Sequence, residues 1–319
     1  MNDNPPPRPR FSSRRPPPRR ATARRGRPGG LRIGEWVRAG GTSGVVRLRM
    51  GGTTGARVGK YRYDLDWMCS ALDGEIFPDE GFDRTTNLVA YTVFREPLSP
   101  WTNEWTNVQN AWTNALEFIS GRDSFNYSSL ETNTLASLTH VLFMDCGLKY
   151  DTTFGASSYT GGLGLWFNLS GYMATNATCD VFKRKRPGNV VNCYDQAGSL
   201  VCFSRLFGID TEYLFQEPFG FLNPISLVGI PGSCNNPFFA ARSTLPLEDV
   251  DNKHRSNFGN HAFVRFSGHV FDSCGGPETG ERTLDVFLLD VIDRSTPDEE
   301  AEAANTNSVP DVYTFQFLD

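Results

Sequence analysis

The segment Asn192–Gly208 constrains the fold most, because it carries a complete set of signals for a single helix. Asn192 is a good N-cap, and Asp195 stands three residues later, where a side chain can return a capping bond. Gly208 suits the position that follows the last helical turn. Cys193 therefore lies in the first turn of a predicted helix, whose apolar positions are Cys193, Ala197, Leu200, Val201, Leu206 and Phe207.

The segment 260–277 consists of two alternating runs about a Ser-Gly turn, which predicts a β-hairpin. If the loop has two residues, the ladder pairs Phe263 with Asp272 and His261 with Cys274. These side chains then share one sheet face, with His261 and Asp272 as diagonal neighbours about 7–8 Å apart at the backbone. A loop of three residues would instead send His261 and Asp272 to opposite faces.

Cys193, His261 and Asp272 together supply the groups that covalent catalysis at an amide requires. The unsatisfied N–H groups and the positive end of the helix dipole favour a thiolate at Cys193 and stabilise an oxyanion beside it. His261 would hold the proton and deliver it to the departing amine, while Asp272 would fix the imidazole tautomer. The resulting thioester would pass its acyl group to water or to another amine.

Two other interpretations of the same residues stay open. The first is an inactive or purely structural version of the site. The second is a zinc site formed by Cys193, His261, Asp272 and Cys274, although no C-x-x-C or H-x-x-x-H spacing supports it. We therefore expect no metal and no cofactor.

A cysteine helix followed in the chain by a histidine–aspartate hairpin resembles the transglutaminase-like branch of the papain-like superfamily. The resemblance covers about residues 189–277 and is most specific in 192–197, 260–263 and 270–274. It implies an α+β fold in which the nucleophile helix packs on an antiparallel β-sheet. It also implies Cys193 as nucleophile, His261 as general base and acid, and Asp272 as the residue that orients the imidazole.

The rest of the chain predicts two parts of one compact body, residues 31–150 and a catalytic core of residues 151–319. Alternating valines and arginines between glycine pairs predict a β-rich segment over 31–63. A helix over 98–120 would carry three indoles on one face, and a second helix is expected over 128–142. A final strand is expected over 312–318. The three indoles are those of Trp101, Trp105 and Trp112.

Residues 1–30 hold eight prolines, nine arginines and a single acidic residue, which predicts a disordered arm. The arm carries about +8 of charge, which leaves about -13 on the remainder of the chain. The folded part is therefore not expected to attract nucleic acid through its general field. The arm itself could contact nucleic acid, another acidic partner or a secretion machine.

These features lead to two hypotheses of different classes. The first is a cysteine-nucleophile enzyme that acts on a protein or peptide as a protease, glutamine deamidase or transglutaminase, a class that includes a delivered toxin or effector. The second is a capsid-like or other structural protein that binds nucleic acid through its arginine-rich arm. No stretch of about 18 uninterrupted apolar residues is present, so we expect a soluble protein, either cytoplasmic or delivered by a non-classical route. The seven cysteines, scattered without close pairs, predict mainly reduced thiols.

Overall fold

The computed structural model describes residues 19–24, 32–37, 50–51, 58–70, 85–101, 111–161, 166–174, 188–217, 219–239, 247, 255–294, 311–313 and 316–317. Two compact units emerge, the first comprising Met1–Ala56 with Lys60–Ala90 and the second Arg57–Gly59 with Tyr91–Asp319. The division therefore falls near residue 90 and differs from the predicted boundary at 150. The physical reason is that helices of residues 111–144 pack against the helix that follows Asn192.

The first unit contains a five-stranded sheet in the order β3-β2-β1-β4-β5. These strands bear out the expected β-rich character of residues 31–63 and extend it beyond that segment. Their bounds are Arg19–Arg24 for β1, Arg32–Val37 for β2, Met50–Gly51 for β3, Gly59–Ser70 for β4 and Thr85–Thr92 for β5.

Strand β1 lies within the Arg/Pro-rich segment of residues 1–30. Its residues pair antiparallel with β2 on one side and with β4 on the other. The strand occupies the proline-free window between Pro18 and Pro28, so every residue has an N–H for a ladder. The remaining residues of the arm lie outside the described residues.

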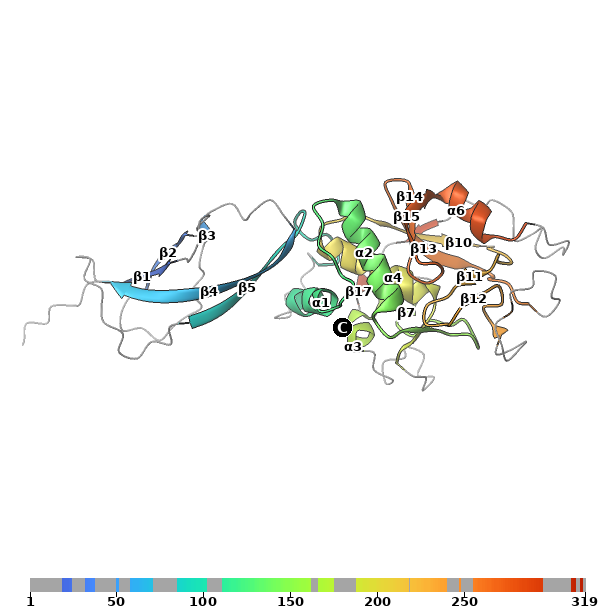
Figure 1. Cartoon of the computed structure of the whole chain (residues 1–319), viewed down its shortest axis with the longest axis horizontal. Helices are drawn as coiled ribbons and strands as arrows, with labels where there is room; N and C mark the ends of the chain where they lie inside the picture. Colours follow the sequence, from blue (N-terminus) through green and yellow to red (C-terminus); the bar gives the residue numbers. More distant parts are fainter. Residues whose placement is uncertain are drawn as a thin grey trace, which may run out of the picture. The chain divides into compact units, whose positions relative to one another are not determined.

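The second unit is built on a five-stranded sheet in the order β15-β14-β13-β10-β16, with helices against it (Figure 1). Helix α4 contacts β13 and β10, while α2 contacts α4, β14 and β15. Helix α6 contacts β14 and β15. The mixture of helices and sheet is that of the expected α+β class. The main bounds are α1 Ala111–Ser120, α2 Glu131–Met144, α4 Cys193–Leu206, β10 Glu212–Gln216, β13 His261–Phe266, β14 His269–Asp272, β15 Glu278–Thr283 and α6 Leu284–Val291.

Aromatic packing shows that helices cover both faces of this sheet. Phe215 of β10 stacks on Tyr194 of α4, with 5.8 Å between ring centroids. On β13, Phe263 pairs in register with Leu214 and packs on Phe287 of α6 at 5.2 Å. Since successive residues of a strand point to opposite faces, the Phe215 and Phe263 side chains lie on opposite sides. The sheet is thus enclosed between α4 and α6.

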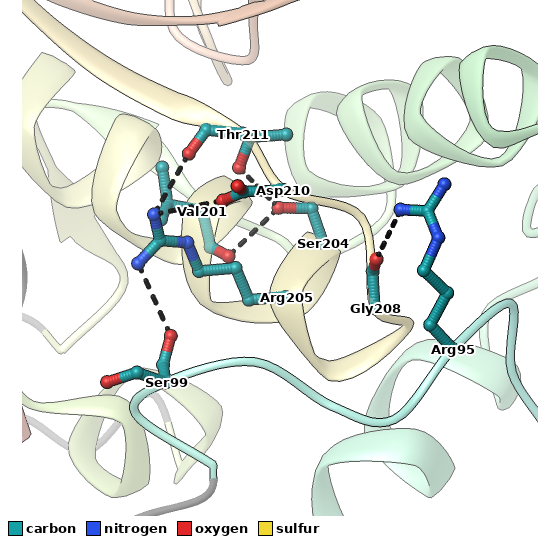
Figure 2. A network of polar contacts seen from close by, with 8 residues as sticks. All are labelled: Arg95, Ser99, Val201, Ser204, Arg205, Gly208, Asp210 and Thr211. Carbon is teal, nitrogen blue, oxygen red and sulfur yellow. Dashed lines mark hydrogen bonds and ion pairs between the residues drawn. The ribbon is translucent and has the colours of Figure 1, made fainter.

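The polar network in Figure 2 joins the last turn of α4 to neighbouring segments of the same chain. The Arg205 guanidinium donates to the carbonyl oxygens of Ser99 at 3.3 Å and Thr211 at 3.2 Å. Arg95 donates to the carbonyl oxygen of Gly208 at 3.3 Å. Gly208 has a φ of 77°, which suits the predicted position just beyond the helix. These bonds join the end of α4 to the segment before α1 and to the start of β10.

The predicted tryptophan helix over 98–120 is wrong at residues 98–101, which are not helical. Helix α1 comprises Ala111–Ser120, Trp101 lies in a turn ahead of it, and residues 102–110 lie outside the described residues. Pro100 explains the difference, because proline lacks an N–H and disfavours helical backbone in the residue before it. Trp101 is buried and donates its indole N–H to the carbonyl oxygen of Cys202 at 2.8 Å, whereas Trp112 is 45 % exposed. Trp105 lies outside the described residues. The second expected helix is confirmed as α2.

Short elements complete the second unit. The expected final strand is two strands in different sheets, β16 pairing with β10 and β17 pairing parallel with β8. No helix in the described ranges is long and apolar enough to cross a membrane. The remaining bounds are β6 Lys149–Tyr150, β7 Thr160–Gly161, β8 Trp166–Phe167, α3 Leu169–Ala174, β9 Val190–Val191, β11 Ile225–Ser226, β12 Ser233–Cys234, β16 Asp311–Tyr313 and β17 Gln316–Phe317.

Candidate functional site

The first turn of α4 is held by a reciprocal capping box, as the sequence predicts. The Asn192 side chain accepts from the Asp195 backbone N–H at 3.2 Å, and the Asp195 carboxylate accepts from the Asn192 N–H at 3.2 Å. Cys193 is the first helical residue, and its side chain is buried among apolar neighbours, with 3 % of the residue exposed. The predicted position of Cys193 at the positive end of a capped helix is therefore confirmed.

Asp195 also fixes a distant loop beside the start of α4. Its two carboxylate oxygens accept backbone N–H groups from Ser158 at 2.7 Å, Tyr159 at 2.9 Å and Thr160 at 2.8 Å. Burial raises the pKa of Asp195 to about 6, although the backbone hydrogen bonds act in the opposite direction. One carboxylate therefore aligns both the helix that begins at Cys193 and the loop that runs past it.

Gln196 connects the same turn to the chain that follows Asp272. Its amide nitrogen donates to the carbonyl oxygens of Leu142 at 3.1 Å and Ser273 at 2.6 Å. Its amide oxygen accepts from the Tyr172 hydroxyl at 2.6 Å. Gln196 is buried, so these three bonds satisfy its carboxamide and limit how far α4 can move relative to the hairpin.

The hairpin has the two-residue loop on which the predicted juxtaposition depends. Phe266 pairs with His269, and the intervening Ser267 and Gly268 have φ values of 51° and 82°. Positive φ at both positions is typical of a type I′ turn, which suits the twist of the flanking strands. The parity of the ladder is therefore the one that places His261 and Asp272 on one face.

The His261 and Asp272 side chains meet in the structure. The imidazole Nε2 lies 2.7 Å from Asp272 Oδ2, and each residue is 2 % exposed. The second carboxylate oxygen, Oδ1, accepts the backbone N–H groups of Cys274 at 2.7 Å and Gly275 at 3.1 Å. Cys274 has thus left the ladder and does not face His261 as predicted, because its carbonyl oxygen accepts instead from the Val228 N–H.

The environment of His261 favours the charged imidazolium despite burial. Burial by itself lowers the pKa of His261, but the Asp272 carboxylate and the Cys193 side chain raise it to about 10. The rings of Phe219, Phe258 and His261 pack together, with Phe219 4.7 Å and Phe258 5.3 Å from the imidazole centroid. His261 is therefore a cation held by one carboxylate in apolar surroundings.

The geometry brings the Cys193 thiol to the same imidazole. The Cys193 side chain is near enough to His261 to contribute to the raised pKa of the imidazole. The ring nitrogen Nδ1 is buried and has no hydrogen-bond partner in the described part of the chain. Tyr194, the next residue of α4, donates its hydroxyl to the Asn260 side chain at 2.5 Å. This bond joins the residues adjacent to Cys193 and His261, so α4 and β13 are tied together at the site.

Three other cysteines, Cys146, Cys202 and Cys274, lie in environments that favour a neutral thiol. Burial raises the pKa of Cys146 to about 12 and raises those of Cys202 and Cys274 well above the usual value. Together with Cys193, these residues are free thiols, as the scattered spacing predicts. None of the three has a histidine as a pKa-shifting neighbour.

The zinc alternative finds no support in the described ranges. No cluster there of three or more His, Cys, Asp or Glu side chains is arranged to hold a metal ion. Asp272 already uses one oxygen for His261 and the other for two backbone N–H groups. The Cys274 thiol is protonated at neutral pH, since burial raises its pKa well above the usual value, whereas zinc binds the thiolate.

Several residues of the site carry no sequence signal of the kind that identifies Cys193. Gln196 follows the capping box directly, and a polar residue on the apolar side of a helix was the only available hint. Phe219 and Phe258 come from loops on either side of a long connection, and nothing in their spacing relates them to His261. Their positions depend on the way in which those loops fold over the sheet.

No family model and no curated protein matches this sequence. Among solved structures, the chain is similar to a crystal structure of red sea bream transglutaminase, with a TM-score of 0.36 and 13 % identity over 80 % of this chain. The match spans 45 % of the length of that transglutaminase chain.

Proposed function

We propose that this chain is a cysteine enzyme that transfers the acyl group of an amide through a thioester on Cys193. The observation that carries the proposal is the contact of one imidazole with both Asp272, at 2.7 Å, and the Cys193 side chain at the start of α4. Acyl transfer through a thioester requires a nucleophile, a base beside it and a carboxylate that orients the base. Cys193, His261 and Asp272 stand in this order. The proposed substrate is a protein or peptide.

The charge distribution supports a thiolate–imidazolium pair. His261, with a pKa of about 10, keeps its proton at neutral pH and can transfer it to a departing nitrogen. Asp272 stabilises that imidazolium, and the backbone N–H of Cys193 at the start of α4 would be a donor to an oxyanion. The thiolate sulfur would attack the amide carbon, and the C–N bond would break as nitrogen takes the proton from His261.

Three reactions share this thioester route and differ only in what enters and leaves. If water accepts the acyl group, the enzyme is a protease when the amide is a peptide bond and a deamidase when the amide is a glutamine side chain. If an amine accepts the acyl group, the enzyme is a transglutaminase. Transfer into another cell as a toxin or effector would give the Arg/Pro-rich arm a role in export. This role is part of the proposal and rests on the sequence of residues 1–30.

Alkylation of the folded protein tests the activated thiol directly. A limiting amount of iodoacetamide at pH 7, followed by peptide mapping, is expected to modify Cys193 ahead of Cys146, Cys202 and Cys274, whose pKa values are raised. The preference should disappear in His261→Ala. Equal modification of all cysteines in the native protein would refute the proposal.

Mass spectrometry on candidate protein substrates separates the three reactions. Deamidation adds about 1 Da, transamidation removes about 17 Da per new crosslink, and proteolysis cleaves the chain, all through the same thioester. The Cys193→Ala variant is the control for each reaction, because it keeps the helix but removes the sulfur.

A further inference from the structure

A second glutamine of the core, Gln216, lies directly beside His261. Gln216 is the last residue of β10 and is paired in register with His261, the first residue of β13. Directly opposite residues of an antiparallel pair project to the same sheet face, with Cβ atoms about 4.5–5.5 Å apart. The Gln216 side chain is therefore a neighbour of the imidazole on the face that also carries Phe263.

The carboxamide oxygen of Gln216 has no hydrogen bond to the described residues. Gln216 is 1 % exposed, and its Oε1 is buried without a partner in the part of the chain that the structure describes. Gln196, buried to a similar extent, makes three side-chain hydrogen bonds and provides the internal comparison. A buried polar atom without a partner destabilises the folded state, so its presence requires an explanation.

In the described part of the chain, the groups packed around the neighbouring imidazole leave Gln216 Oε1 without a bonded donor. The imidazole of His261 bonds Asp272 through Nε2, and its buried Nδ1 has no hydrogen-bond partner among the described residues. The remaining ring neighbours of His261 are phenylalanines, which supply no N–H or O–H group. A substrate group bound against His261 would therefore meet Gln216 Oε1 as the acceptor on that face.

We propose that Gln216 accepts an N–H from the nitrogen that enters or leaves at the Cys193 thioester. The inference rests on the proposed acyl transfer and assigns one more residue to it. When an amine attacks the thioester carbon, the C–N bond forms, the C–S bond breaks and the Cys193 thiolate departs. One amine proton passes to His261, so the nitrogen must lie against the imidazole. A second N–H then points to the neighbouring Gln216 Oε1, which aligns the nitrogen lone pair with the carbon.

The experiment compares two small nucleophiles that differ in the number of protons they carry. p-Nitrophenyl acetate would acetylate Cys193, and the acetyl-enzyme would then react with methylamine or with methanol. Methylamine keeps an N–H for Gln216 after one proton has gone to His261, whereas methanol has only the O–H that goes to His261. In Gln216→Met we expect about tenfold slower aminolysis, the loss of one hydrogen bond, with the p-nitrophenolate burst and methanolysis unchanged.

Thermal unfolding supplies a readout that a merely structural residue would not give. Replacement of an unpartnered carboxamide by an apolar side chain of similar shape is expected to raise the Tm of Gln216→Met by about 2–4 °C. Asn235→Leu is the matched control, because both polar atoms of that buried side chain lack partners within the described ranges. It should raise the Tm as well but leave aminolysis unchanged.

The following outcomes would overturn the role of Gln216 or the proposed function. Equal losses of burst, methanolysis and aminolysis in Gln216→Met, or a lowered Tm, would make Gln216 structural and overturn the inference. Unchanged aminolysis would also overturn it. Absence of a burst in the unaltered protein is a separate result, which would refute the proposed function and with it this role of Gln216.

Discussion

The two ends of α4 are fixed by different kinds of interaction. At its start, Asn192, Asp195 and Gln196 are fully buried, and their side chains form a dense set of hydrogen bonds to backbone groups. At its end, Arg205 makes longer contacts of 3.2–3.4 Å, one of them to the exposed side chain of Asp210. Buried bonds that cannot be replaced by water hold geometry more strictly than exposed ones. The helix is therefore held most firmly at the turn that carries Cys193.

Two cysteines on this helix show what that difference means for chemistry. Cys193 lies in the first turn, at the positive end of the helix dipole, and contacts a cationic histidine. Cys202 lies within the helix among apolar side chains, and burial raises its pKa well above the usual value. The same side chain thus lies beside a cationic histidine at one position, whereas at the other the effect of burial exceeds that of the neighbouring Arg205.

The largest expected difference in acyl-transfer activity is between Cys193→Ala and Cys202→Ala. Cys193→Ala should reduce acyl transfer about 10³-fold or more, because the covalent route is lost, while Cys202→Ala should retain activity within several-fold. The latter leaves a small cavity and should cost about 1 kcal/mol of stability. Turnover of p-nitrophenyl acetate and thermal unfolding measure the two quantities. Comparable activity losses in both variants would remove the distinction between the positions.

A smaller loss of activity, with a shifted pH profile, is expected when the histidine loses its carboxylate. Asp272→Asn should lower acyl transfer about 10²–10⁴-fold, since the imidazolium is no longer stabilised. Asp272 is the main group that raises the pKa of His261 to about 10, so the alkaline limb of the rate profile should move to lower pH. A profile that keeps its position would show that Asp272 does not control the charge of His261.

The same pKa shift predicts how stability depends on pH. A histidine pKa raised from 6.5 to about 10 contributes stability that is complete below pH 6.5 and is lost as pH rises towards 10. This decline should be reduced in Asp272→Asn, because the pKa of its His261 lies closer to the unfolded value. Urea unfolding at several pH values from 6 to 10 follows the difference between the two proteins.

The smallest expected effects are on the free energy of unfolding, and they differ between the two ends of α4. Asp195→Ala removes the acceptor for backbone N–H groups of Ser158, Tyr159 and Thr160 and should cost about 3 kcal/mol or more. Arg205→Ala should cost only about 1 kcal/mol, since its contacts are longer and partly exposed to water. Denaturant unfolding gives both values. A loss in Arg205→Ala equal to that in Asp195→Ala would contradict the contrast between the two ends.

Local bonds explain which parts of the fold were predictable. The capping box of Asn192 and Asp195 joins residues three apart, and the hairpin loop at Ser267 is set by its own turn geometry. Such features are written in short stretches of sequence. The boundaries of α4 and the parity that brings His261 to Asp272 were therefore accessible without a structure.

Long-range packing decided the rest. The alternating pattern of residues 312–318 predicts one strand, but β16 and β17 pair with strands of two different sheets. Trp101 follows a helix-like spacing, yet it fills the core from a turn because Pro100 prevents helical backbone there.

By itself, the sequence determined the first turn of a capped helix at Cys193 and the hairpin that carries His261 and Asp272. Only the tertiary structure brought Gln216 into register with His261 and gave Asp195 its distant N–H donors. The reason is that caps and tight turns are closed by neighbouring residues, whereas strand pairing across long connections depends on which apolar surfaces can be buried together.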